Sequence, residues 1–351
     1  MDLRQFNTYK ILNHSKIIRA LLENKNPFPV SCEIDPSNLC NHACHWCYFG
    51  DSRKVKKANL DKGVLFKLID ELAAGKTRSI TFTGGGEPLV NPATIEAIVR
   101  ARKKGIRVGL VTNGGLLDRK KNEVIVSCCD FVRISLDAPD AYSHARLHRP
   151  ANPKIDNFED ILLNLHRLVI LRRKSKKDIT IGVGFLINKG NYKKLPILAE
   201  RLKKIGVDYL QIRPIVMPQD NSLTQIWTRA FKYIQKALSS SDKKFHVFPI
   251  DYRYHEMINK GRNYQSCNTH KLLAVVGADG NVYMCSLFRG DNKFSFGNLY
   301  RQSFAQIWRG KRRRAVMQSL NIRRCPPCRY NRYNEILEYM LSRNKPHADF
   351  L

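Results

Sequence analysis

Short apolar or β-branched runs alternate with amphipathic stretches from Ser31 to about Arg213, and this alternation restricts the fold more than any other feature. Six runs have the composition of strands: Val30–Ile34, Ser79–Thr83, Arg107–Thr112, Phe131–Leu136, Ile179–Ile187 and Tyr209–Ile212. Helical periodicity fills most of the gaps between them, as in Asp61–Ala74, Ala93–Lys104, Phe158–Leu171 and Leu195–Lys204. Such alternation indicates βαβ units and a parallel sheet. We predict an α/β fold, a partial (β/α)6 TIM-like barrel, with its site at the C-terminal ends of the strands.

Three cysteines lie within eight residues directly after the first predicted strand, in the stretch CNHACHWC. Cys40, Cys44 and Cys47 can converge on one small site, and soft thiolates suit iron–sulfur clusters, zinc or Cu(I). A [4Fe–4S] cluster usually takes four cysteines, so a triad leaves one iron open to a second molecule. A zinc knuckle completed by His42 or His45 is the alternative.

The CX3CX2C spacing, with Trp46 before the third cysteine, resembles the cluster motif of the radical S-adenosylmethionine (radical SAM) superfamily. The resemblance implies that Cys40, Cys44 and Cys47 hold a [4Fe–4S] cluster, that SAM chelates its fourth iron, and that Trp46 lies beside this cofactor. It further implies an electron donor of the flavodoxin or ferredoxin type. Reductive cleavage of SAM would then give methionine and a 5′-deoxyadenosyl radical, which abstracts a hydrogen atom from the substrate.

Two other motifs follow predicted strands. The stretch TGGGEP resembles the GGEP element that holds the SAM amino group in this family, which implies that role for Gly85, Gly86 and Glu87. A plain glycine turn is the alternative. Ser135 and Asp137 belong to SLDA, which resembles an element whose serine contacts the SAM ribose or carboxylate. Capping of the next helix is the alternative for these two side chains.

Three more residues are candidates for contact with SAM. Asn113, in VTNGG after the third predicted strand, resembles the TNG element of the family, which implies a position near SAM. Arg146 or Arg149 could pair with the SAM carboxylate through a bidentate fork. The sequence does not choose between these two arginines, and a surface position is the alternative for each.

Four cysteines near the C-terminus form a second candidate metal site. Cys267, Cys285, Cys325 and Cys328 are enough for a closed auxiliary [4Fe–4S] cluster or for a structural zinc site. The spacing of Gly280 before Cys285 resembles the CX9–15GX4C opening of the SPASM and Twitch extensions of radical SAM proteins. No cysteine follows Cys328, so this part resembles Twitch and implies one auxiliary cluster.

We expect four segments: an N-terminal helical lead-in over 1–28, a radical SAM core over 29–213, a connector over 214–266 and a Twitch/SPASM-like auxiliary iron–sulfur domain over 267–351. The connector contains a predicted helix over Leu223–Leu238. The last segment begins with a predicted β-hairpin, Leu272–Val276 and Asn281–Met284, around the turn GADG. A helix over Ser303–Gln318 and another after Arg332 follow.

The remaining cysteines and several histidines have no partner at a convincing metal-ligand spacing. We expect no metal role for Cys32, Cys128, Cys129, His144, His148, His255 and His270.

The chain of 351 residues has a net charge of +31, which favours anionic partners such as nucleotides, nucleic acid or an acidic peptide. The basic residues are dispersed, whereas a nucleic-acid footprint should be concentrated. No apolar run approaches the roughly 18–20 residues of a membrane span, and the first residues lack a signal-peptide core. We therefore expect a cytoplasmic protein in which ten cysteines favour metal ligation over disulfides.

These observations predict a radical SAM enzyme of the oxidoreductase type. Its expected substrate is a small polar metabolite, such as a sugar, aminocyclitol or nucleotide, with net oxidation, dehydrogenation or epimerisation. Maturation of a ribosomally made peptide and modification of RNA or DNA are the alternatives within the family. A non-catalytic, zinc-stabilised nucleic-acid-binding protein is the alternative outside it, but it leaves TGGGEP and SLDA unexplained.

Overall fold

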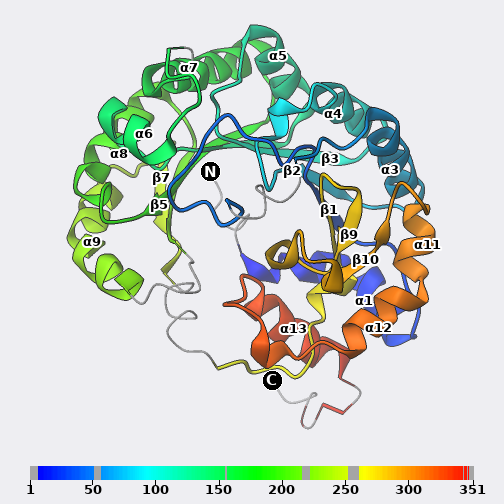
Figure 1. The fold of residues 1–351 in the computed structure, drawn as a ribbon. Helices are drawn as coiled ribbons and strands as arrows, with labels where there is room; N and C mark the ends of the chain where they lie inside the picture. The colour runs from blue at the N-terminus through cyan, green and yellow to red at the C-terminus, as the bar shows by residue number, and fades with distance from the viewer. Residues whose placement is uncertain are drawn as a thin grey trace.

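One ten-stranded sheet organises the molecule (Figure 1). The structure is a computed structural model that describes residues 7–50, 57–154, 156–215, 222–251, 261–342, 344, 345 and 347. The strands are β1 Ser31–Ile34, β2 Ser79–Phe82, β3 Arg107–Thr112, β4 Phe131–Ser135, β5 Thr180–Ile187, β6 Tyr209–Pro214, β7 His246–Pro249, β8 Leu273–Val276, β9 Asn281–Tyr283 and β10 Ser295–Asn298. Their order across the sheet is β10-β9-β8-β1-β2-β3-β4-β5-β6-β7.

Strands β1 to β7 run parallel in sequence order, as the alternating pattern predicts. The α-helices of the described residues are α1 Ser15–Leu22, α3 Lys62–Ala74, α4 Thr94–Lys103, α5 Arg119–Cys128, α6 Ala141–His148, α7 Phe158–Ser175, α8 Leu195–Ile205, α9 Ser222–Leu238, α11 Phe304–Arg309, α12 Lys311–Gln318 and α13 Asn331–Leu341. Figure 1 shows the helices from α3 to α9 forming the outer arc around the strands. The fold is therefore an open α/β barrel with a C-terminal extension.

The two faces of the barrel strands differ in polarity. Side chains such as Ile34, Phe82 and Ile134 are fully buried in the core that the strands share with the helices. Their neighbours Glu33 and Arg133 point the other way and line an internal cavity. Because side chains alternate along a strand, an apolar outer face leaves the inner face free for polar chemistry.

The C-terminal extension continues the barrel sheet rather than forming a separate one. Strand β8 pairs in parallel with β1, from Ser31 opposite Leu273 to Ile34 opposite Val276. The predicted hairpin is present, since β8 and β9 are antiparallel and Gly280 has a φ of 79° in the turn. A small second core of Ile11, Ile18, Leu272 and Leu337 joins the N-terminal segment to α13.

Some elements differ from the sequence prediction. The segment expected to be a connector contributes α9 and also β7, a seventh parallel strand. The single helix predicted over Ser303–Gln318 is wrong, because Gly310 is extended, with a ψ of 157°, and separates α11 from α12. Bounds for α5 and α6 were not predicted from the sequence, although Asp118 and Asp140 cap these helices by accepting hydrogen bonds from backbone N–H groups.

No helix among the described residues is both long and apolar enough to span a bilayer.

Candidate active site and auxiliary metal centre

The three N-terminal cysteines lie in the loop after β1 and line one cavity of about 400 Å³. Loops after β2, β3 and β4 complete the rim of this cavity, as expected for the C-terminal ends of parallel strands. The end of α6 holds the cysteine loop in position. The Ala43 N–H donates to the carbonyl of His148 at 3.0 Å, and the Ala151 N–H donates to the carbonyl of Asn41 at 2.8 Å.

The glycine-rich loop after β2 packs directly on the cysteine loop. A Cβ on Gly86 would lie 2.1 Å from the Leu39 carbonyl oxygen, so only glycine allows this approach. The same oxygen accepts the Glu87 N–H at 2.8 Å. The neighbouring Gly85 donates its N–H to Asp35 Oδ2 at 3.1 Å. TGGGEP is thus more than a plain turn, because it fixes the backbone of the loop that carries the cysteines.

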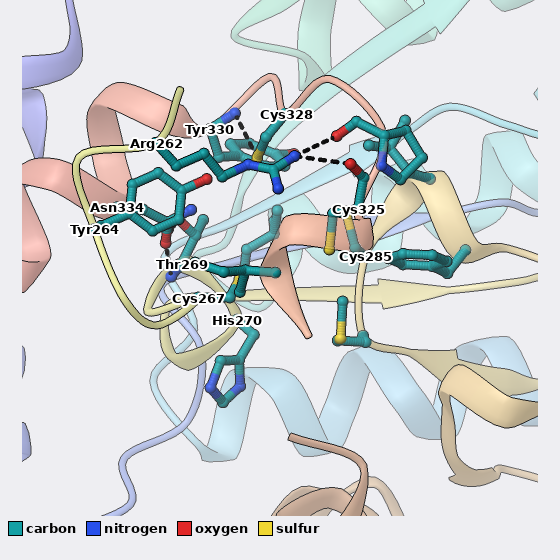
Figure 2. A pocket seen from close by; sticks show the side chains of 16 residues that line it. Arg262, Tyr264, Cys267, Thr269, His270, Cys285, Cys325, Cys328, Tyr330 and Asn334 are labelled. Carbon is teal, nitrogen blue, oxygen red and sulfur yellow. Dashed lines mark hydrogen bonds between the residues drawn. The ribbon is translucent and has the colours of Figure 1, made fainter. Parts of the chain in front are cut away.

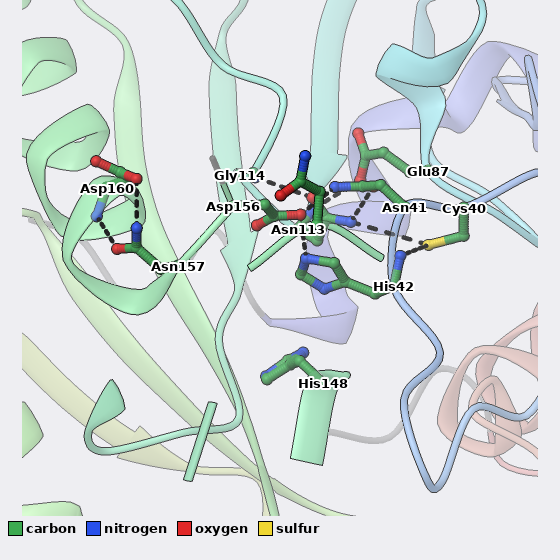
Figure 3. Close-up of polar contacts among 12 residues, drawn as sticks. Cys40, Asn41, His42, Glu87, Asn113, Gly114, His148, Asp156, Asn157 and Asp160 are labelled. Carbon is green, nitrogen blue, oxygen red and sulfur yellow. Dashed lines mark hydrogen bonds and ion pairs between the residues drawn. The ribbon is translucent and has the colours of Figure 1, made fainter. Parts of the chain in front are cut away.

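The Glu87 carboxylate joins this loop to the loop after β3. Its Oε1 accepts the Thr112 hydroxyl at 2.6 Å and the Leu89 N–H at 3.0 Å, and its Oε2 accepts the Asn113 N–H at 2.7 Å. Burial raises the pKa of Glu87 above its ordinary value, although these hydrogen bonds act in the opposite direction. The Asn113 side chain donates in turn to Asn41 Oδ1 at 2.8 Å and lies 3.8 Å from Cys40 Sγ (Figure 3).

Asp137, just beyond β4, ties the cysteine loop to β5. Its Oδ2 accepts the Trp46 indole N–H at 3.1 Å, and its Oδ1 accepts the Leu186 N–H at 2.7 Å. Burial raises the pKa of Asp137 to about 6, while these two hydrogen bonds lower it. Ser135 lines the same cavity, so both SLDA residues lie at the predicted site.

The arginines at the cavity are not the ones that the sequence suggested. Arg146 is exposed on α6, donates to the Gly190 carbonyl at 3.4 Å and does not line the cavity, and Arg149 is also exposed. Arg133 on β4 and Arg213 on β6 line it instead. Strand alternation could have identified Arg133, because it precedes Ser135 by two residues and so shares its face.

Two further arginines reach the cavity from the cysteine-bearing loops of the C-terminal extension. Arg289, four residues after Cys285, pairs with Glu33 Oε2 at 3.1 Å and with Asp35 Oδ2 at 2.8 Å. Arg329, the residue after Cys328, pairs with the other oxygen of Glu33. Burial alone would raise the pKa of Glu33, but Arg329 and Arg289 outweigh it and leave this pKa below the ordinary value. This ionic network fastens the extension to the inner face of β1.

The four C-terminal cysteines line one small cavity of about 30 Å³ (Figure 2). Burial is the main cause that raises the pKa of the Cys267 thiol to about 12 and that of the Cys325 thiol to about 11. Arg262 braces the loop by donating to the carbonyls of Cys325 and Pro326 at 2.8 and 2.9 Å. Four soft donors around so small a space fit a closed four-thiolate metal centre.

Asn334 on α13 is buried and lines the same small cavity as the four cysteines. Its Oδ1 accepts the N–H groups of Asn268 and Thr269, each at 2.8 Å, and the Thr269 hydroxyl at 2.9 Å. This buried amide therefore supports the loop that follows Cys267.

A histidine cluster beside the cysteine loop was missed by sequence reasoning. His42, His144 and His148 are buried and have ring nitrogens within 4.8 Å of one another, so the last two are not isolated as predicted. His42 Nε2 contacts Asp156 Oδ2 at 2.8 Å (Figure 3). His45 is exposed. The i,i+4 spacing of His144 and His148 on α6 could have identified this pair, whereas His42 is 102 residues from His144 and has no local link to it. His255 lies outside the described residues.

Two family models match the chain. The radical SAM superfamily model matches residues 34–184, and the SPASM model, an iron–sulfur cluster-binding domain, matches residues 267–330. The chain belongs to the radical SAM superfamily. These domains use [4Fe–4S] clusters and SAM, which are the cofactors of this radical SAM enzyme. The thiol sets described above fit them, with three cysteines facing an open cavity and four enclosing a small one.

Among its relatives is the tungsten-containing aldehyde ferredoxin oxidoreductase cofactor-modifying protein of Pyrococcus furiosus, 26% identical over 308 residues and covering 80% of each chain. The dTDP-4-amino-4,6-dideoxy-D-glucose ammonia-lyase of Streptomyces venezuelae is 25% identical over 263 residues, which cover 71% of this chain and 53% of the lyase. The crystal structure of Streptococcus suis SuiB bound to the precursor peptide SuiA has a TM-score of 0.66 at 14% identity, covering 89% of this chain and 72% of SuiB. The likeness to SuiB concerns the fold alone.

Proposed function

We propose that this radical SAM enzyme abstracts a hydrogen atom from a small polar metabolite that carries an anionic group. The observation that carries the proposal is one cavity lined by Cys40, Cys44 and Cys47, by the TGGGEP and SLDA loops, and by the inward-facing Arg133 and Arg213. The first two sets suit SAM and its cluster, and the arginines suit an anion.

The cofactor roles follow the cavity lining. Cys40, Cys44 and Cys47 hold the open cluster, and the edge formed by Gly85 and Gly86 receives the SAM amino group. When bound, the reduced cluster supplies the electron that cleaves SAM to methionine and the 5′-deoxyadenosyl radical. Asn113, Ser135 and Trp46 line the same cavity. In this proposal their side chains contact the bound SAM. Glu87 acts mainly by holding the loops after β2 and β3 together.

The anionic preference rests on the wall formed by β4, β5 and β6. Gly184 of β5 lies between the two arginines, since a Cβ there would lie 3.2 Å from Arg213 Nη2 and 3.4 Å from Arg133 Cδ. The two guanidinium groups beside this glycine place positive charge on the wall, and planar guanidinium forks bind phosphate or carboxylate well. The relative named as a dTDP-sugar lyase is consistent with a substrate of this kind.

The net reaction depends on whether the auxiliary centre accepts an electron. Cys267, Cys285, Cys325 and Cys328 give a closed ligand set, which leaves electron transfer or a structural role. If it accepts the electron of the substrate radical, the net reaction is a dehydrogenation or another oxidation. If it is structural only, a redox-neutral outcome such as epimerisation follows.

The cofactor part is tested with anaerobically reconstituted full-length protein, dithionite and SAM. We expect Cys44→Ala to abolish 5′-deoxyadenosine formation, whereas Cys128→Ala, on α5 and outside the cavity lining, keeps it. Continued 5′-deoxyadenosine formation in Cys44→Ala contradicts the proposed cluster ligands.

The substrate part is tested with extracts of cells grown in deuterated medium, because abstraction transfers deuterium from the substrate into 5′-deoxyadenosine. We expect the label to arise with the small anionic fraction and to decrease at least tenfold in the Arg133→Gln/Arg213→Gln double variant. Label that arises only with the peptide, nucleic-acid or neutral fraction contradicts the proposed substrate class.

A further inference from the structure

We infer that His148 is a fixed N–H donor to the Cys44 sulfur and that it raises the reduction potential of the cluster held by Cys40, Cys44 and Cys47. The inference rests on the proposed ligand set of the open cluster. His148 itself binds neither iron nor SAM in this proposal, and it acts as a positioning residue through Cys44.

The position of the histidine proton follows from the backbone. The Asp137 N–H points at His148 Nε2 over 2.9 Å, and an amide N–H can only donate. His148 Nε2 must therefore carry the lone pair, which in a neutral imidazole leaves the proton on Nδ1. His148 Nδ1 lies 3.4 Å from Cys44 Sγ, within hydrogen-bond distance for sulfur. His148 as a whole residue is 2% exposed, so water does not compete for this contact.

The ring is also held in its orientation. His148 lies at the end of α6, whose preceding turn packs His144 against it with centroids 4.9 Å apart and planes 26° from parallel. The His148 carbonyl meanwhile accepts the Ala43 N–H, so the same residue holds the cysteine loop by its backbone. Main chain and side chain of His148 thus contact two successive residues of that loop, Ala43 and Cys44.

A metal ion shared by His42, His144 and His148 is the competing explanation for the cluster of rings. Stacked, nearly parallel rings direct their lone pairs side by side rather than to one point, which disfavours a metal common to His144 and His148. His148 Nε2 is already occupied by the Asp137 N–H. These contacts favour an orienting role for the three histidines over binding of a metal ion by them.

A hydrogen bond to a ligating sulfur withdraws electron density from an iron–sulfur cluster and stabilises its reduced form. Reduction takes one electron from the external donor, dithionite in vitro, and transfers no atom at His148. Asp137 belongs to the SLDA element, and its N–H sets the His148 tautomer. The loop after β4 is thereby linked, through His148, to the reduction potential of the iron–sulfur cluster.

The test is an EPR-monitored redox titration of the reconstituted full-length enzyme. We expect His148→Phe, which keeps a planar ring but has no N–H, to lower the reduced-to-oxidised ratio of the open cluster about tenfold at a fixed potential, a shift of about 59 mV for one electron. His148→Gln, which keeps a donor, should recover part of the shift. The auxiliary cluster serves as an internal reference, and His144→Phe serves as the matched control because it keeps the stacked ring.

An unchanged potential in His148→Phe with full iron content overturns the inference, and so does an equal shift in His144→Phe. If His148→Phe does not assemble its cluster, wild-type enzyme with ¹⁵N-labelled histidine is examined by pulsed EPR for a weakly coupled ¹⁵N and an exchangeable proton at the reduced open cluster. Absence of both couplings overturns the inference equally. Neither result tests whether Cys40, Cys44 and Cys47 are the ligands of the open cluster. The Cys44→Ala experiment tests that separately.

Discussion

Replacing Gly86 by alanine inserts a methyl group between the glycine-rich loop and the backbone of the cysteine loop. The new Cβ would lie 2.1 Å from the Leu39 carbonyl oxygen and 2.5 Å from the Asn38 carbonyl carbon. Neither atom can rotate away, so the loops must separate by more than about 1 Å to reach ordinary van der Waals distance. The separation also strains the hydrogen bond from the Glu87 N–H to the Leu39 carbonyl.

The expected loss of stability combines these two effects. Overpacking against a rigid neighbour costs about 1–3 kcal/mol, and the lost backbone hydrogen bond costs about 1 kcal/mol. We therefore expect Gly86→Ala to lower the unfolding free energy of the metal-free protein by about 2–4 kcal/mol. Because the cysteine loop moves with the strain, iron content and SAM affinity should fall as well.

Urea unfolding under anaerobic conditions measures the effect, with Gly85→Ala as the matched control. A Cβ on Gly85 meets Asp35 Oδ2 at 3.7 Å and Asn38 Cβ at 3.9 Å, which are ordinary contacts. That variant should unfold at nearly the wild-type urea midpoint. Equal midpoints for Gly86→Ala and Gly85→Ala refute the reasoning.

Three other perturbations have defined outcomes. Glu33→Gln removes the carboxylate that Arg289 and Arg329 share, although Arg289 keeps its pair with Asp35. Urea unfolding should therefore show a loss of about 1.5–3 kcal/mol. A loss well below about 1 kcal/mol contradicts a buried network. The folded protein retains the Asp137 proton up to about pH 6, whereas an unfolded aspartate loses it near pH 4. The unfolding free energy of the metal-free protein should therefore decrease as pH rises through this window, by up to about 3 kcal/mol from this group, and an equally steep slope in Asp137→Asn counts against it. Burial raises the pKa of the Cys267 thiol to about 12, and a thiol that binds a metal is deprotonated. Zinc added to the metal-free auxiliary site should therefore release one proton per thiol near pH 7, measured with an indicator dye. Zinc binding without proton release contradicts the presence of protonated, buried thiols at this site.

Much of the barrel could be predicted because its pattern is local. Apolar alternation and β-branched runs marked β1 to β6 to within a residue or two, and the C-terminal ends of these strands then grouped the cysteine, TGGGEP and SLDA loops. Short β7 was missed because four residues ending in Pro249 provide little periodic signal. The break at Gly310 was missed because the residues on both sides are good helix formers.

The parts of the site that were not predicted depend on contacts between distant segments. Arg289 and Arg329 meet Glu33 across more than 250 residues, and His148 meets Cys44 across 104 residues. Arg146 and Arg149 were both candidates for a fork to the SAM carboxylate, but both are exposed, and Arg146 donates to the Gly190 carbonyl instead. Local spacing identifies which residues can do chemistry, whereas packing decides which of them reach the cavity.

The parallel pairing of β8 with β1 has a consequence for synthesis of the chain on the ribosome. The first barrel strand leaves the ribosome about 240 residues before its outer partner, an interval of roughly 10–50 s at common elongation rates. During that time β1 presents an open strand edge next to the nascent cysteine loop, and such edges recruit other strands. We therefore expect the two halves, expressed as separate polypeptides, to be less soluble than the whole chain.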